Sequence, residues 1–128
     1  HFNDFANENI VLDGEVESAK AFMQKHNIMI VPLWNGSGIR IKILEAMALG
    51  KTIISTSIGA SGINYENKKN ILIADTAEQF VNQIIWCFEN PTESRKIGEN
   101  AKDNILENYN TKEISENLFS FLNKIQTI

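Results

Sequence analysis

The stretch that decides the fold runs from residue 31 to residue 63 and reads VPLWNGSGIRIKILEAMALGKTIISTSIGASGI. An apolar run, 28–31, leads into it, and a second apolar run, 52–56, lies inside it. Between the two runs is a strongly apolar segment, 39–49, which predicts a buried helix that ends at Gly50. Apolar runs without alternation are typical of strands that are covered on both faces, as in a parallel sheet.

Outside this stretch the sequence continues to alternate between predicted strands and helices. We expect a strand at 9–12, a helix at 15–26, a strand at 71–73, a helix that Thr76 and Gln79 cap, a helix from Pro91 to about residue 108 and a last helix over 111–128. The last helix carries apolar side chains along one side, which favours self-association of the chain. The order of elements predicts an α/β fold, with a Rossmann-like, mostly parallel sheet flanked by helices.

The composition is that of one globular domain over 1–128. The hydrophobic fraction of 43% is typical of a globular protein, and the formal net charge of −4 argues against nucleic acid as the main partner. The single cysteine, Cys87, cannot form an internal disulfide and fits a reducing compartment such as the cytoplasm. Because the chain starts at His1 rather than Met, we expect an N-terminally truncated piece of a longer protein, with 1–8 as a leading segment.

Two loops in the deciding stretch have the composition of a ligand site. In open α/β sheets, ligands bind beyond the carboxyl ends of the strands, where loops lead into helices. The loops 35–38 and 57–62 both follow predicted strands, and their glycines allow a ligand to approach the backbone closely. The helix after the first loop would point its N–H groups at the ligand, an arrangement that holds phosphate. The same glycines also suit two tight turns that bind nothing, and both interpretations stay open.

The helix predicted over 39–49 carries three charged residues on an otherwise apolar surface, Arg40, Lys42 and Glu45. Charged side chains are seldom buried unless they are paired or bind something. In one interpretation Lys42 and Glu45 form an ion pair, and Arg40 extends past the helix end into solvent. In the other, Arg40 and Lys42 neutralise phosphates, while Glu45 accepts hydrogen bonds from sugar hydroxyl groups.

Other residue types that could take part in site chemistry are few. Trp34 either stacks on a ligand or is an ordinary surface or core aromatic. His26 falls at a predicted helix end, and Cys87 falls among apolar neighbours, as a small buried residue does. No carboxylate pair and no histidine cluster has the spacing of metal ligands, so we expect no metal.

The stretch 31–63 resembles the C-terminal half of the group 1, family-4-type glycosyltransferases, which have the GT-B fold. The residues that carry the resemblance are Gly38, the run EAMALG at 45–50, Thr56, Gly59 and Gly62. The similarity extends with lower specificity from Ile10 to the segment NYNTKEI that precedes the last predicted helix. It therefore covers nearly the whole chain.

This resemblance implies a two-domain enzyme with its active site in the cleft between the domains. The N-terminal domain of such an enzyme holds the acceptor, and the C-terminal domain, to which this chain would correspond, holds the nucleoside diphosphate sugar. The implied reaction transfers a hexose-type sugar to a glycan or lipid acceptor with retention, and it uses no metal or other cofactor. The resemblance implies bacterial glycan biosynthesis in the cytoplasm, with peripheral attachment to the inner face of the membrane as an open alternative. Without the missing acceptor domain, this chain alone should be inactive.

The motif of the family is a Glu followed, after seven residues, by a second Glu. Glu45 matches the second Glu, which binds the nucleotide ribose in the family, whereas Ser37 stands where the first Glu would fall. The second loop would present backbone N–H groups to the donor, and Gly14 matches a family glycine near the base site. The donor-binding residues that follow are Gly36, Ser37, Gly38, Arg40, Lys42, Glu45, Gly59, Ala60, Gly62 and Gly14, with the catalytic residues unassigned.

The serine at position 37 also favours a second hypothesis. A chain that lacks the first Glu of the motif could be a non-catalytic module of the same fold, which binds a nucleotide sugar or a protein partner.

Overall fold

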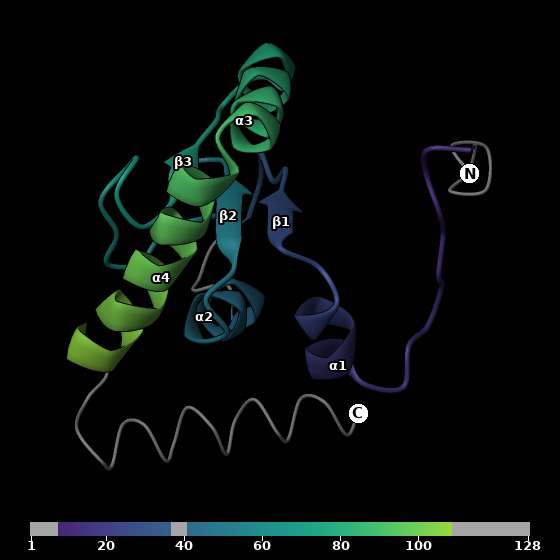
Figure 1. Cartoon of the computed structure of the whole chain (residues 1–128), viewed down its shortest axis with the longest axis horizontal. Helices are drawn as coiled ribbons and strands as arrows, with labels where there is room; N and C mark the ends of the chain where they lie inside the picture. The colour runs from purple at the N-terminus through teal and green to yellow at the C-terminus, as the bar shows by residue number, and fades with distance from the viewer. Residues whose placement is uncertain (1–7, 37–40, 109–128) are drawn as a thin grey trace.

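The computed structural model describes residues 8–36 and 41–108, and Figure 1 shows how they are arranged. The elements in chain order are α1 (Ala19–Gln24), β1 (Ile28–Val31), α2 (Ile41–Ala48), β2 (Thr52–Ser55), β3 (Leu72–Ile73), α3 (Ala77–Glu89) and α4 (Pro91–Asn108). The predicted α/β class is confirmed. The last predicted helix, 111–128, lies outside the described residues. The self-association that we expect from this helix stays a prediction.

The strands form a parallel sheet in the order β1-β2-β3. Ile28 of β1 pairs with Thr52 of β2, and Ile54 of β2 pairs with Leu72 of β3. All residues of β2 are buried, because this central strand has helices on both faces as well as a strand on each side. The two-sided burial expected for 28–31 is wrong, since β1 is an edge strand and its Ile30 is 49% exposed. The apolar runs without alternation therefore predicted both the parallel pairing and the burial of the central strand.

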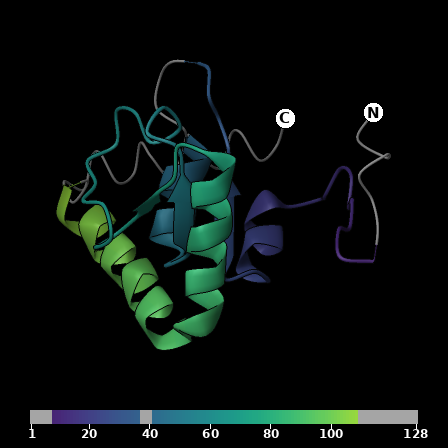
Figure 2. The ribbon, with the colours of Figure 1, turned by 90° about the horizontal axis from the view of Figure 1, so that it is seen from above.

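Two hydrophobic clusters lie on opposite faces of the sheet. Ile53 belongs to a cluster with Met47 of α2, whereas Ile54 belongs to a cluster with Phe80 and Cys87 of α3. Because neighbouring residues of a strand point to opposite faces, α2 and α3 cover different faces. Helix α4 contributes buried residues to both clusters and lies beside α3, as Figure 2 shows. The expected burial of Cys87 is confirmed.

The end of α2 has the geometry that the sequence predicts. Gly50 adopts a φ of 73°, in the left-handed region that favours glycine. Its N–H donates to the carbonyl of Met47 at 2.9 Å, and the N–H of Lys51 donates to the carbonyl of Ala46 at 3.0 Å. These two bonds close the helix and turn the chain directly into β2. Residues 43–47 are all buried, so α2 is held firmly against the sheet.

Thr76 caps the start of α3, as predicted. The hydroxyl oxygen of Thr76 accepts a hydrogen bond from the N–H of Gln79 at 3.1 Å. The side-chain carbonyl of Gln79 accepts a bond from the N–H of Asp75 at 2.7 Å. Only one half of the predicted capping box is formed, because Gln79 accepts from the N–H of Asp75 rather than from that of Thr76. The two bonds hold Asp75 between the end of β3 and the start of α3.

The segment before β1 departs from the prediction. The strand expected at 9–12 is wrong apart from a single bridge residue, Ile10. Val11 is 76% exposed, and residues 8–18 form an arm that stands away from the sheet in Figures 1 and 2. An apolar run becomes a strand only where another strand pairs with its backbone, and none of β1, β2 and β3 pairs with it. The helix expected at 15–26 is shorter, because the hydroxyl of Ser18 accepts from the N–H of Ala21 and caps α1 there.

Candidate functional site

The loops that follow the three strands meet at the carboxyl edge of the sheet. Thr56 connects the first two loops, because its hydroxyl donates a hydrogen bond to the carbonyl of Leu33 and its N–H donates to the carbonyl of Val31. The same hydroxyl oxygen accepts a bond from the N–H of Gly59 at 2.9 Å. Thr56 is buried, so this junction is a fixed part of the scaffold.

Asp75 connects the second and third loops. One carboxylate oxygen accepts the N–H of Ser57 at 2.8 Å, and the other accepts the Ser57 hydroxyl at 2.7 Å. The bond from the backbone N–H, followed by the bond from the hydroxyl, lowers the pKa of Asp75 from its ordinary value of 3.8. The carboxylate is therefore ionised at neutral pH and acts as an acceptor for the start of the second loop.

Trp34 lies between the first and third loops. Its indole N–H donates to the backbone carbonyl of Asp75 at 2.8 Å, and its ring centre lies 6.0 Å from that of Phe80. The side chain nevertheless remains 48% exposed. The contacts thus place Trp34 at the surface and fix one edge of its ring to the scaffold, an arrangement compatible with both interpretations of this residue.

The second glycine loop is tightly folded. Gly59 is buried, and a Cβ there would lie 2.5 Å from the Ser55 hydroxyl. The N–H of Gly59 is donated to Thr56, and the N–H of Ala60 is donated to the Thr56 carbonyl at 3.1 Å. Within residues 8–36 and 41–108 the N–H of Gly62 bonds to no acceptor, and Gly62 is exposed with a φ of 83°. Of the three predicted backbone donors, Gly62 is thus the one that faces solvent.

The predicted residues at the start of α2 differ in exposure. Lys42 is exposed, in the first turn of the described helix. Glu45 is 6% exposed and takes part in an interaction with a neighbour. Gly36 is exposed with a φ of 122°, a conformation that suits glycine. The remaining predicted residues of this region, Ser37, Gly38 and Arg40, lie outside the described residues.

Gly14 is separate from the other predicted site residues. It lies in the arm 8–18 with a φ of 67°, and no atom comes within 4 Å of the position that a Cβ would take. Figure 1 shows this arm beyond α1, away from the loops that follow the strands. The structure therefore joins the start of the loop after β1, at Leu33, to the second glycine loop through Thr56, and it leaves Gly14 apart from them.

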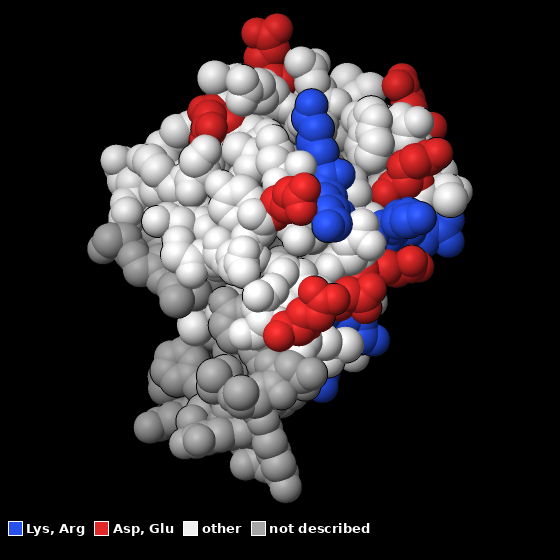
Figure 3. Space-filling model, turned by 90° about the vertical axis from the view of Figure 1, so that its left-hand side faces the viewer, with Lys and Arg blue, Asp and Glu red and all other residues white. Residues whose placement is uncertain are grey.

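A polar groove of about 480 Å³ lies between α4 and the segment 64–70. Its asparagines bond to the backbone of that segment: the side-chain amide of Asn104 donates to the carbonyl of Asn64 at 2.6 Å, and that of Asn100 donates to the carbonyl of Lys69 at 2.9 Å. Figure 3 shows the side of the molecule that carries α4, where basic and acidic side chains are interspersed. These amides hold the approach to β3 in place.

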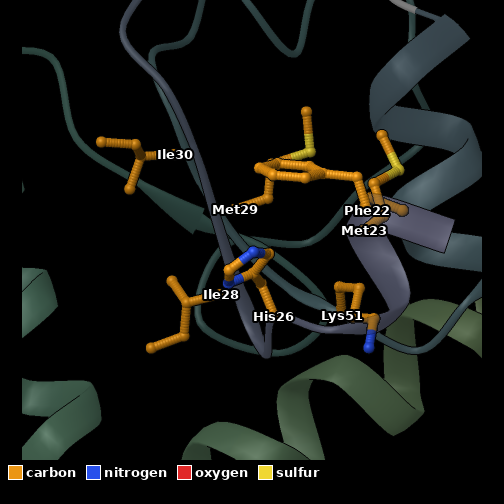
Figure 4. A pocket seen from close by; sticks show the side chains of 8 residues that line it. Phe22, Met23, His26, Ile28, Met29, Ile30 and Lys51 are labelled. Atoms are coloured by element: carbon orange, nitrogen blue, oxygen red, sulfur yellow. The ribbon is translucent and has the colours of Figure 1, made fainter. Parts of the chain in front are cut away.

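An apolar pocket of about 250 Å³ lies between α1 and the outer edge of β1. Figure 4 shows Phe22 and His26 of the α1 side facing Met29 of the strand, and the ring centres of Phe22 and His26 lie 4.8 Å apart. Lys51 and His26 come just before the strands, so the pocket is near their amino ends. It is therefore at the opposite end of the sheet from the glycine loops.

Among the described residues no group of three or more His, Cys, Asp and Glu side chains is placed to hold a metal ion. In the same part of the chain, no helix combines the length and the apolar character that crossing a bilayer requires.

Comparison with known proteins identifies the family. The family model described as glycosyl transferases group 1 matches residues 2–90. The chain therefore belongs to the group 1 glycosyltransferases, as its resemblance to that family implied. The motif residues of the second loop and of α2 all fall within the matched range.

Two curated relatives and one solved structure are similar to the chain. It is 31% identical over 111 residues to an uncharacterised 44.6 kDa protein in the cps region of Klebsiella pneumoniae, covering 87% of this chain. It is 33% identical over 113 residues to the uncharacterised glycosyltransferase MJ1069 of Methanocaldococcus jannaschii, covering 85% of this chain. The chain spans 29% of the length of each relative.

The crystal structure of Anabaena Alr3699/HepE in complex with UDP shares the fold. The TM-score is 0.66 at 18% sequence identity, and the likeness covers 80% of this chain and 29% of that one. The parallel sheet with helices on both faces is thus an arrangement that the chain shares with that protein. At this level of identity the likeness concerns the fold alone.

Sequence reasoning missed Asp75 and Ser57. The bonds between them join residues 18 positions apart, and they depend on the pairing of β2 with β3. The only signal in the sequence is an Asp that directly follows a predicted strand, a position that is often polar for reasons of solubility alone.

Proposed function

We propose that this chain is the donor-binding domain of a glycosyltransferase that transfers a sugar from a nucleoside diphosphate sugar to a glycan or lipid acceptor, with retention. The observation that carries the proposal is that the loops after β1 and β2 are joined through Thr56 at the carboxyl edge of a parallel sheet. Ligands of open α/β sheets bind at this edge. The UDP of the Anabaena complex makes UDP the first nucleotide to test.

The roles of the residues follow from their chemistry. Lys42 is exposed near the start of α2, and with Arg40 it would offset the negative charge of the diphosphate. The N–H of Gly62, which bonds to no acceptor among the described residues, would donate to a phosphate or sugar oxygen. Glu45 would accept from the ribose hydroxyl groups. These donors and the helix dipole would stabilise the leaving nucleoside diphosphate, so we propose that the reaction uses no metal cofactor.

The acceptor would be held by a part of the protein other than this chain. The support for this proposal is that the chain spans 29% of each curated relative. We therefore expect an N-terminal acceptor domain, and we expect the 128-residue chain alone to transfer no sugar. We further propose a role in bacterial glycan biosynthesis in the cytoplasm, with peripheral attachment to the inner face of the membrane as the alternative location.

The test is a transfer assay on the complete protein with each nucleotide sugar in turn, followed by single Arg40→Ala, Lys42→Ala and Glu45→Ala variants. We expect each variant to slow transfer by about ten-fold or more, because each removes a charged contact to the donor. Lys96→Ala is the matched control, since Lys96 is an exposed lysine on α4. Transfer that survives all three substitutions would show that the charged residues of this helix are structural.

Ser37 favours a second candidate function, a non-catalytic module that binds nucleotide sugar or a protein partner. The two functions differ in one result. A non-catalytic module would bind UDP-sugar without releasing UDP, with or without added glycan, whereas the proposed enzyme releases UDP in proportion to sugar transferred. Restoring the carboxylate with Ser37→Glu distinguishes them further, because a gain of transfer would show that this position limits catalysis.

A further inference from the structure

Asp75 is not one of the predicted site residues, yet it holds the start of the second glycine loop. Its carboxylate oxygens accept both donors of Ser57, at 2.8 Å from the backbone nitrogen and 2.7 Å from the hydroxyl oxygen. Both residues are exposed, so hydrophobic packing does not explain why they meet. Exposed hydrogen bonds contribute little to the free energy of unfolding. Their main effect is therefore on the position of Ser57 and of the loop that it begins.

The backbone of Asp75 is fixed as well. Its carbonyl accepts the indole N–H of Trp34, and its N–H donates to the side chain of Gln79. Every polar group of this residue therefore has a partner, and the partners come from three places: the loop after β1, the loop after β2 and the first turn of α3. Asp75 is the point at which the loops after all three strands are joined.

The position of Asp75 on the sheet makes it a rigid anchor. The N–H of Ala74, the residue before it, donates to the carbonyl of Ser55 at 2.9 Å and continues the pairing of β2 with β3. The residue after it, Thr76, caps α3. Asp75 therefore sits between two ordered elements, and Ser57 is tied to it at the point where the second loop leaves β2.

We propose that Asp75 is a positioning residue, which holds the loop 57–62 and the loop after β1 in the conformation that receives a nucleoside diphosphate. The inference rests on the proposed function of these loops. In it, Asp75 acts through Ser57 and does not itself contact the nucleotide sugar. A loop that is ordered before binding loses less conformational entropy when the ligand arrives, and this raises affinity. Gly62, which is exposed, lies at the far end of the same loop. The orientation of Ser57, the first residue of the loop, therefore affects the direction of the Gly62 N–H.

The experiment measures UDP affinity of the complete protein by isothermal titration, for the wild type and three variants. Asp75→Ala removes both bonds to Ser57 and leaves the backbone bonds of residue 75 in place. Ser57→Ala removes the hydroxyl bond and keeps the bond from the backbone N–H. Thr76→Ala is the control, because it removes the adjacent helix cap and destabilises α3 without touching the bonds of Ser57.

We expect Asp75→Ala to raise the Kd for UDP about ten-fold, Ser57→Ala to raise it about three-fold and Thr76→Ala to change it by less than about two-fold. Deuterium exchange of the unliganded protein should rise in 57–62 for Asp75→Ala and in the first turn of α3 for Thr76→Ala. If Asp75→Ala does not fold, the Ser57→Ala result decides on its own. An unchanged Kd for UDP in both Ser57→Ala and Asp75→Ala would overturn the inference. So would a rise of the Kd in Thr76→Ala as large as the rise in Asp75→Ala.

The failure of the proposed function would look different. If the wild-type protein binds none of UDP, ADP and GDP, the proposed function fails, and the positioning role fails with it. If the wild type binds UDP and Asp75→Ala binds it equally well, the proposed function stands and the positioning role alone is contradicted.

Discussion

The carboxylate of Asp75 accepts two hydrogen bonds from Ser57, one from its backbone N–H at 2.8 Å and one from its hydroxyl at 2.7 Å. This pair joins the third strand to the second glycine loop across the carboxyl edge of the sheet. With the Thr56 hydroxyl bonded to the carbonyl of Leu33, it makes one connected network of the loops after β1, β2 and β3.

The first prediction concerns the titration of Asp75. The two bonds from Ser57 hold its pKa below 3.8, so the stabilisation that they give is fully present above pH 3.8 and is lost as the pH falls through the lowered value. NMR titration of the side-chain carboxyl carbon should show a midpoint below 3.8 in the wild type. In Ser57→Ala the midpoint should move up toward 3.8, because the hydroxyl donor is gone. A midpoint at or above 3.8 in the wild type would show that the pair does not form in solution.

The second prediction concerns Gly59. A Cβ at this position would lie 2.5 Å from the Ser55 hydroxyl and 3.2 Å from both the Thr56 hydroxyl and Val31. Gly59→Ala should therefore reduce the free energy of unfolding by about 2 kcal/mol, measured by urea denaturation. Ser61→Ala, an exposed change in the same loop, should alter it by less than about 0.5 kcal/mol. Equal stability of the two variants would contradict the close packing of Gly59.

The third prediction concerns the approach of α4 to the turn between α2 and β2. A Cβ at Gly98 would lie 2.2 Å from the carbonyl oxygen of Gly50 and 3.1 Å from the carbonyl carbon of Lys51. Since backbone atoms cannot move aside as a side chain can, Gly98→Ala should cost about 3 kcal/mol of stability. Glu99→Ala, on the exposed side of the same helix, is the control and should have almost no effect on urea unfolding. A stable Gly98→Ala protein would mean that α4 packs less closely than described.

The fourth prediction separates binding from stability at Lys42. Because its side chain is exposed, Lys42→Ala should change the free energy of unfolding by less than about 0.5 kcal/mol. If Lys42 offsets the charge of the diphosphate, the same variant should weaken UDP binding about ten-fold, and the wild-type affinity should fall as salt is added. Titration calorimetry at two salt concentrations measures both effects. A Lys42→Ala protein with wild-type affinity would remove this lysine from the proposed site.

Much of the fold could be predicted because its signals are local. The apolar runs at 28–31 and 52–56 indicated parallel strands, although only the second is buried throughout. Gly50 and Thr76 marked helix ends through bonds to residues three to five positions away. The run at 9–12 shows the limit of this reasoning. Its apolar side chains indicate a tendency to be buried, but they carry no information on whether a partner strand lies beside them.

The candidate site was predictable in position and less so in detail. The glycines of 57–62 lie at the carboxyl edge of the sheet, as expected for a loop that follows a parallel strand. That Gly59 and Ala60 use their N–H groups inside the loop depends on the position of the Thr56 side chain. The roles of Asp75 and Trp34 depend on contacts 18 and 41 residues apart in the sequence, which only the folded sheet creates.

The most direct measurement of the central claim is deuterium exchange of the complete protein with and without saturating UDP, followed at peptide resolution. If the chain is a donor-binding domain, UDP should protect peptides that cover 57–62 and the start of α2, and leave the groove between 64–70 and α4 unchanged. Protection confined to other parts of the chain, or no protection by UDP, ADP or GDP in a folded protein, would contradict the claim that the two glycine loops form the nucleotide site.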